Sequence, residues 1–221
     1  MPHGSLPLPA RLFLLAHDPG KGRVTGAPDV VLAVRAGALA ELAARALVQE
    51  TDGTVTPVLD ARADDPVLDE LLELIGESRP RTWRGLITHR ARGTRDTVRR
   101  ELAAQGYLRA ERRRVLGLFP ATRYVLARAG YVQVLRAEAR VALTGPAAPE
   151  AVHPDQAALV VLAAAGHFRG LLSWRERRRH AERLSALAEH AGPYVPQLRK
   201  ALEAEVRKAE AARASDGGGG G

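Results

Sequence analysis

The chain of 221 residues contains no cysteine. Disulfides, thiolate nucleophiles and cysteine-ligated metal sites are therefore excluded, and the composition suits a reducing cytoplasm. The first nine residues hold three prolines and lack the basic segment and apolar run of a secretory signal. We therefore expect a cytoplasmic protein.

The sequence also lacks an uninterrupted apolar stretch long enough to cross a bilayer. The longest apolar segment, residues 30–48, is broken by Arg35, Glu41 and Arg45. Charges at such intervals are typical of a buried core helix and not of a membrane span. Any association with a membrane is expected to be peripheral.

Motifs that carry catalysis are missing as well. The chain has no HExxH, no GxSxG, and no GxGxxG after a predicted strand. Its histidines are scattered, and His180 and His190 lie too far apart to form a ligand pair on one helix face. We predict that the protein is not an enzyme, and that it uses no cofactor and no metal.

Lysine is scarce, with three residues, whereas arginine is concentrated in one segment. Residues 79–114 contain twelve arginines against three acids, a local charge of +9 in a chain whose net charge is +8. A focused positive field favours anionic partners, namely lipid headgroups, nucleic acid or an acidic protein. A general compositional preference for arginine is the alternative explanation.

Apolar spacing and turn residues predict a mainly helical chain. Leu12 to Leu15 is interpreted as a strand or a short apolar segment, and Asp52-Gly53 indicates a tight hairpin turn. A second hairpin is predicted from two β-like runs over residues 115–126. Helices are expected over residues 29–48, 66–75, 94–105, 137–143, 155–165, 174–190 and 196–213.

Four arginines are candidates for binding a phosphate group. Arg92, Arg95 and Arg99 follow at i, i+3 and i+7, so they share a helix face or flank the start of a helix. Guanidinium groups bind phosphate bidentately, and a helix N-terminus adds N–H donors. Arg35 is isolated in an apolar run; it either forms a structural contact or reaches the same pocket.

These features resemble the Golgi phosphoprotein 3 family, in order over roughly residues 10–205. Four stretches carry the resemblance: Leu12-Phe13-Leu14-Leu15-Ala16-His17-Asp18, residues 35–43 (RAGALAELA), residues 65–72 (DPVLDELL), and residues 92–108, which include Glu101-Leu102-Ala103-Ala104-Gln105-Gly106-Tyr107-Leu108. The order and spacing of the four stretches are more specific than any one of them.

The resemblance implies a single globular, mainly α-helical domain over residues 11–213, from which a β-hairpin protrudes. Residues 1–10 are expected to be flexible, and the glycine-rich residues 214–221 to be disordered.

The resemblance further implies a peripheral membrane protein that binds phosphatidylinositol 4-phosphate through basic residues, matched here by Arg35, Arg92 and Arg95. We add Arg99 as a neighbour on the same helix. A hairpin tip with Leu116, Leu118 and Phe119 is implied to contact the membrane or to mediate homo-oligomer formation. The family's pocket tryptophan has no aromatic counterpart near Gly26.

Two alternatives stay open. Residues 79–126 have the outline of a winged helix, a basic helix followed by a β-wing, which predicts binding of nucleic acid. Against it, the predicted recognition helix carries Asp96 and Glu101 and lacks Asn or Lys for base edges. The charged helices over residues 174–213 could instead form a scaffold for protein interactions.

Overall fold

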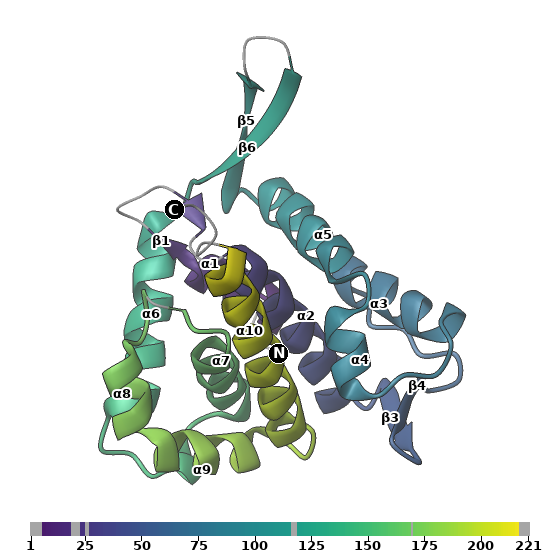
Figure 1. The fold of residues 1–221 in the computed structure, drawn as a ribbon, viewed down its shortest axis with the longest axis vertical. Helices are drawn as coiled ribbons and strands as arrows, with labels where there is room; N and C mark the ends of the chain where they lie inside the picture. Colours follow the sequence, from purple (N-terminus) through teal and green to yellow (C-terminus); the bar gives the residue numbers. More distant parts are fainter. Residues whose placement is uncertain (1–5, 19–22, 25–26, 116–118, 169, 217–221) are drawn as a thin grey trace.

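The computed structural model describes residues 6–18, 23–24, 27–115, 119–168 and 170–216. Within these residues the fold is mainly α, which confirms the prediction (Figure 1). The helices are α1 (Leu8–Leu15), α2 (Ala27–Ala44), α3 (Pro66–Glu77), α4 (Trp83–Thr88), α5 (Ala91–Ala104), α6 (Ala129–Thr144), α7 (Pro154–Ala165), α8 (Trp174–Arg179), α9 (Ala181–Ala191) and α10 (Val195–Asp216), with a 3-10 turn, η1 (Pro149–Ala151), before α7. Three antiparallel strand pairs accompany them: β1 (His17–Asp18) with β2 (Arg23–Val24), β3 (Val48–Thr51) with β4 (Thr54–Pro57), and β5 (Leu108–Val115) with β6 (Phe119–Leu126).

Helix α2 lies at the centre of the core and packs against α1, α4, α5, α7 and α10. Gly37 permits a close approach of α1, because a Cβ atom there would lie 2.4 Å from Leu12 Cδ1 on α1. The end of α10 is tied back to the start of α2 by Arg213, whose Nη2 lies 2.5 Å from Asp29 Oδ1. The central helix therefore fixes the positions of the elements that surround it.

The segment from Leu12 to Leu15 is a short apolar segment, but it is helical, so its interpretation as a strand was wrong. Helix α1 begins at Leu8, with Pro9 in its first turn, where a missing N–H costs nothing. Its leucines are buried on every side, so the sequence shows no helical periodicity. Leu6 and Leu8 also belong to the core, and the packed chain thus begins before residue 11.

Two local predictions are confirmed. Strands β3 and β4 form the hairpin around Asp52 and Gly53, whose positive φ angles of 50° and 76° match a type I′ turn. Helix α3 begins where Asp65-Pro66 indicates, and the Asp65 carboxylate accepts hydrogen bonds from the N–H groups of Val67 and Leu68.

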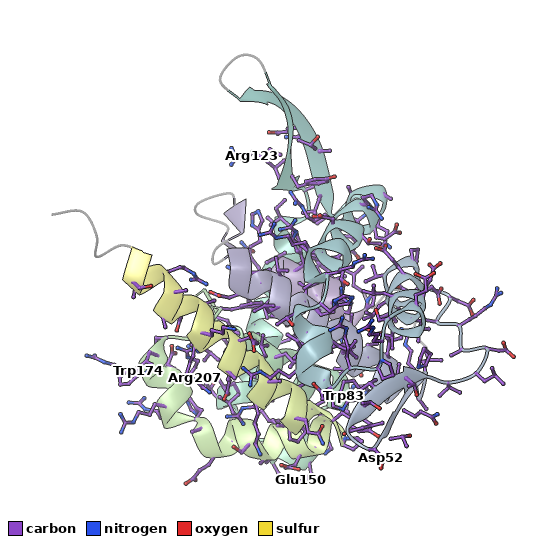
Figure 2. The ribbon with its side chains drawn as sticks, turned by 45° about the vertical axis from the view of Figure 1, so that its right-hand side comes forward. Asp52, Trp83, Arg123, Glu150, Trp174 and Arg207 are labelled. Carbon is purple, nitrogen blue, oxygen red and sulfur yellow. The ribbon has the colours of Figure 1, made fainter. Side chains whose placement is uncertain are left out.

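Other boundaries differ from the prediction. Strand β5 begins at Leu108, well before the predicted run, and the β5–β6 hairpin projects away from the helical body with Arg123 on it (Figures 1 and 2). Helix α6 is also longer than predicted and runs from Ala129 to Thr144. The single helix expected over residues 174–190 is interrupted at His180, which ends α8 and precedes α9.

Candidate anion-binding site

The candidate site is built where α4 meets α5. Helix α4 ends at Thr88, and Arg90 then adopts a left-handed conformation with φ 49° and ψ 30° before α5 begins at Ala91. No side chain caps the start of α5, and its first turn contains no acidic residue. The N–H groups at this end are therefore not satisfied by a side chain, and the helix dipole favours a negative charge there.

A hollow of about 540 Å³ lies beside this helix start. We call it the α5 hollow. Its walls combine apolar side chains of α2 with residues of the α4–α5 junction and the first turns of α5: Val31, Leu32, Thr88, Arg90, Ala91, Arg92 and Arg95. Three arginines thus line one hollow beside an uncapped helix start, a combination suited to a phosphate or carboxylate.

The arginines of the α5 hollow differ in their partners. Arg92 is exposed and forms no ion pair within the described part of the chain. Arg95 is partly neutralised, because its Nε and Nη2 donate to Asp96 Oδ1 at 2.9 and 2.7 Å. Arg90 was missed by the sequence reasoning, since its left-handed conformation and its place at the hollow depend on how α4 packs against α2.

Arg35 is not in the α5 hollow, contrary to the idea that it converges there with Arg92 and Arg95. Its side chain is 1% exposed, and its Nη2 donates to the carbonyl oxygen of Arg90 at 2.9 Å. It lies against a different, smaller cavity of about 210 Å³, which Glu70, Glu73 and Glu77 also line. The structure therefore places Arg35 behind the peptide that starts α5.

Burial makes the charged form of Arg35 less stable. Loss of solvent lowers its pKa to about 10, although the nearby Glu70 carboxylate acts in the opposite direction. Its Nε and Nη1 are buried without a hydrogen-bond partner among the described residues. Arg35 is still a cation at neutral pH, directly beneath the junction.

Arg99 does not line the α5 hollow either. Its guanidinium lies over the ring of Tyr124 on β6, 4.5 Å from the ring centroid, and its Nη1 is 3.5 Å from Asp96 Oδ1. Arg99 thus joins α5 to the hairpin. Leu116 and Leu118 lie outside the described residues, and for Phe119 only the backbone position at the start of β6 is described.

No group of three or more His, Asp or Glu side chains suited to a metal ion occurs among the residues that the structure describes. Nor, over the same residues, does a helix combine the length and apolar character needed to cross a bilayer.

The chain is thus a mainly α-helical protein with a projecting hairpin and an arginine-lined hollow at a helix start. It belongs to the Golgi phosphoprotein 3 (GPP34) family, whose model matches residues 8–209. The predicted family is confirmed over nearly the whole chain. A comparison with curated proteins finds no match.

Proposed function

We propose that this protein is a peripheral membrane protein that binds an anionic phospholipid headgroup in the α5 hollow. The observation that carries the proposal is the presence of Arg90, Arg92 and Arg95 around the uncapped start of α5. The family resemblance implies a headgroup of the phosphatidylinositol 4-phosphate type. A phosphate monoester fits the arrangement, because guanidinium forks and backbone N–H groups both bind its oxygens.

The expected membrane affinity is modest. Each arginine near an anionic leaflet contributes about 1 kcal/mol. The pairing of Arg95 with Asp96 reduces the contribution of one of the three. Binding through this hollow alone would be reversible, so a second contact is needed for stable recruitment. We assign that contact to the hairpin tip with Leu116, Leu118 and Phe119, through insertion into the membrane or self-association.

Binding of nucleic acid is the second candidate, because α4, α5 and the β5–β6 hairpin follow in the order of a winged helix. The side chains of α5 argue against it. Arg95 and Arg99 both contact Asp96, and Arg100 lies 3.6 Å from Glu70. Few arginines of this helix are left to follow a phosphate backbone, which needs several separate contacts.

Co-sedimentation with liposomes tests the proposal. We expect the protein to bind neutral phosphatidylcholine vesicles weakly and vesicles that also contain phosphatidylinositol 4-phosphate strongly. The double variant Arg92→Ala, Arg95→Ala is expected to lose most of this binding. A mobility shift on random duplex DNA measures the alternative; binding to DNA without binding to vesicles would reverse the ranking.

The matched control is Arg62→Ala, Arg79→Ala. Both arginines are exposed, lie outside the α5 hollow, and form no ion pair within the described residues. This variant loses the same net charge, so it reports the general electrostatic effect. If both double variants bind equally well, the α5 hollow is not the headgroup site.

A further inference from the structure

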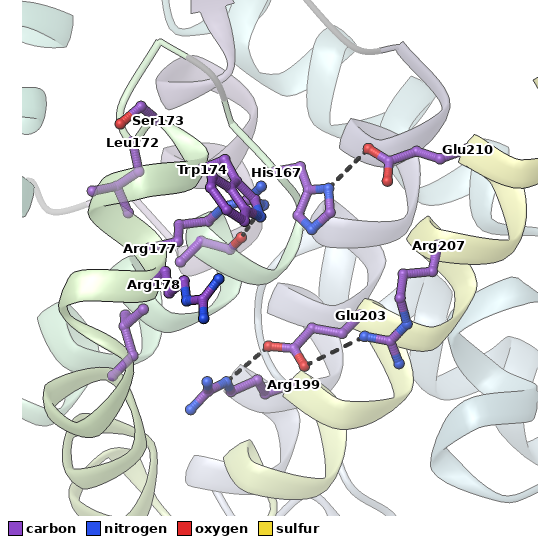
Figure 3. A pocket seen from close by; sticks show the side chains of 12 residues that line it. His167, Leu172, Ser173, Trp174, Arg177, Arg178, Arg199, Glu203, Arg207 and Glu210 are labelled. Carbon is purple, nitrogen blue, oxygen red and sulfur yellow. Dashed lines mark hydrogen bonds and ion pairs between the residues drawn. The ribbon is translucent and has the colours of Figure 1, made fainter. Parts of the chain in front are cut away.

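A larger hollow of about 960 Å³ lies between α8, α9 and α10, beside the end of α7 (Figure 3). We call it the α8–α10 hollow, and it shares no residue with the α5 hollow. Its floor is apolar, formed by the buried side chains of Ala164, Leu172 and Leu184. Small-molecule sites commonly have volumes of about 300–1,000 Å³ and an apolar lining.

The carboxylates on the α10 side of the hollow already have basic partners. Glu203 accepts a hydrogen bond from Arg199 at 3.0 Å and lies 4.0 Å from Arg207 (Figure 3). Glu210, at one end of the hollow, lies 2.9 Å from His167. Since basic groups already engage both carboxylates, neither is available to attract a cationic ligand.

The opposite wall, on α8, presents an aromatic ring and a free positive charge. Trp174 is 62% exposed, which is unusual for so large an apolar side chain. The Cζ atom of Arg178 lies 5.7 Å from its ring centroid. Arg178 is itself exposed and has no carboxylate partner among the described residues. A flat ring can stack on such a pair while an attached anion contacts the guanidinium.

We propose that the α8–α10 hollow binds a small molecule that carries both an aromatic ring and an anionic group, such as a phosphate or carboxylate. Four arginines and two carboxylates line it, so its charge is positive. The aromatic part stacks on Trp174 above the apolar floor, and Arg178 binds the anion. Arg178, which has no carboxylate partner among the described residues, suits one phosphate and not an extended phosphate backbone.

Isothermal titration calorimetry of the full chain tests this site with two aromatic anions, adenosine monophosphate and phenyl phosphate. Adenosine and inorganic phosphate are the ring-only and anion-only probes. We expect at least one of the two aromatic anions to bind with a stoichiometry of one molecule per chain. Its affinity should be about tenfold or more higher than that of adenosine or inorganic phosphate, given typical stacking contributions. Trp174→Leu and Arg178→Gln are each expected to weaken it about tenfold.

Two controls separate this site from other sources of binding. Arg179→Gln removes the adjacent exposed arginine of α8, which does not line the hollow, and should leave the affinity unchanged. The variant Arg92→Ala, Arg95→Ala should also leave it unchanged. The proposal is overturned if neither aromatic anion binds, if the halves bind equally well, or if binding depends on Arg92 and Arg95 in place of Arg178.

Discussion

Arg90 links α4 to α5 in a left-handed conformation, which costs a residue with a side chain about 1–3 kcal/mol. Two donors stabilise its carbonyl oxygen: the N–H group of Gly93 at 3.0 Å and the buried guanidinium of Arg35 at 2.9 Å. The conformation directs the start of α5 toward the α5 hollow. Arg35 therefore supports the site from below without lining it.

Replacement of Arg35 by methionine tests this role. The fall of its pKa from the ordinary value of an arginine to about 10 corresponds to a penalty of about 3 kcal/mol on the buried charge. Arg35→Met removes that penalty and also removes a charged hydrogen bond of about 1.5–3 kcal/mol. We expect the free energy of unfolding in urea to change by no more than about 1.5 kcal/mol, whereas binding to vesicles falls.

The opposite result would be equally informative. If Arg35→Met lowers the free energy of unfolding by more than about 3 kcal/mol, Arg35 is chiefly a structural residue. If stability and vesicle binding are both unchanged, the hydrogen bond to Arg90 does not position the α5 hollow.

At the scale of elements, α3 depends on its N-cap. The Asp65 carboxylate accepts from two N–H groups at 3.0 Å, those of Val67 and Leu68. Asp65→Ala is expected to lower the free energy of unfolding by about 1–2 kcal/mol. Glu73→Ala, on an exposed position of the same helix, is expected to change it by no more than about 0.5 kcal/mol. Equal effects of the two variants in urea unfolding would contradict the capping role.

Helix α8 should be sensitive to acid. Hydrogen bonds from the N–H and hydroxyl groups of Ser173, and then from Arg140, lower the pKa of Glu176 from 4.5 to about 2. A carboxylate with a lowered pKa stabilises the folded state above its ordinary pKa and loses this effect as the pH falls through the lowered value. The stability advantage over Glu176→Gln should therefore shrink between about pH 4.5 and about pH 2.

Thermal unfolding at a series of pH values measures this difference. An advantage that stays constant down to the lowest pH would contradict the capping box formed by Ser173 and Glu176. Because α8 carries Trp174 and Arg178, loss of the capping box in acid should also destabilise the position of these two side chains at the α8–α10 hollow.

The elements that the sequence predicted well have local signals. Asp65-Pro66 and Asp52-Gly53 each determine a cap or a turn without help from the rest of the fold. Helix α1 has no such signal, because burial on all sides removes its periodicity. The beginning of β5 was missed for the opposite reason: Arg109 and Ala110 are both exposed, so the strand shows no apolar alternation.

Part of the candidate site also has a local signal in the sequence. Arg92 and Arg95 are three residues apart in one helix, so sequence spacing alone brings them together. The relation of Arg35 to them depends on how α2 packs against the α4–α5 junction, which no spacing encodes. Arg99 does not join them in the hollow, because its guanidinium lies over the ring of Tyr124 in the hairpin that follows α5.

At the scale of the whole molecule, internal pairs reduce the positive field of residues 79–114. Arg84 pairs with Glu205 of α10 at 2.7 Å, and Arg109 pairs with Glu111 on β5 at 2.9 Å. The charges of the α5 arginines that lie near Asp96 and Glu70 are partly neutralised in the same way. Arg90 and Arg92, which line the α5 hollow, have no carboxylate partner within the described residues, so their charge stays available to a membrane.

A phosphorylated headgroup that binds at the start of α5 should contact the free N–H groups of this helix end. The most direct measurement is a titration of the isotope-labelled protein with inositol 1,4-bisphosphate, a soluble headgroup analogue, followed by amide chemical shifts in NMR. We predict that the largest shifts occur at the N–H groups of Ala91 and Arg92, and that they disappear in the Arg92→Ala, Arg95→Ala variant. Shifts confined to other elements, or an unchanged spectrum, would contradict headgroup binding at the start of α5.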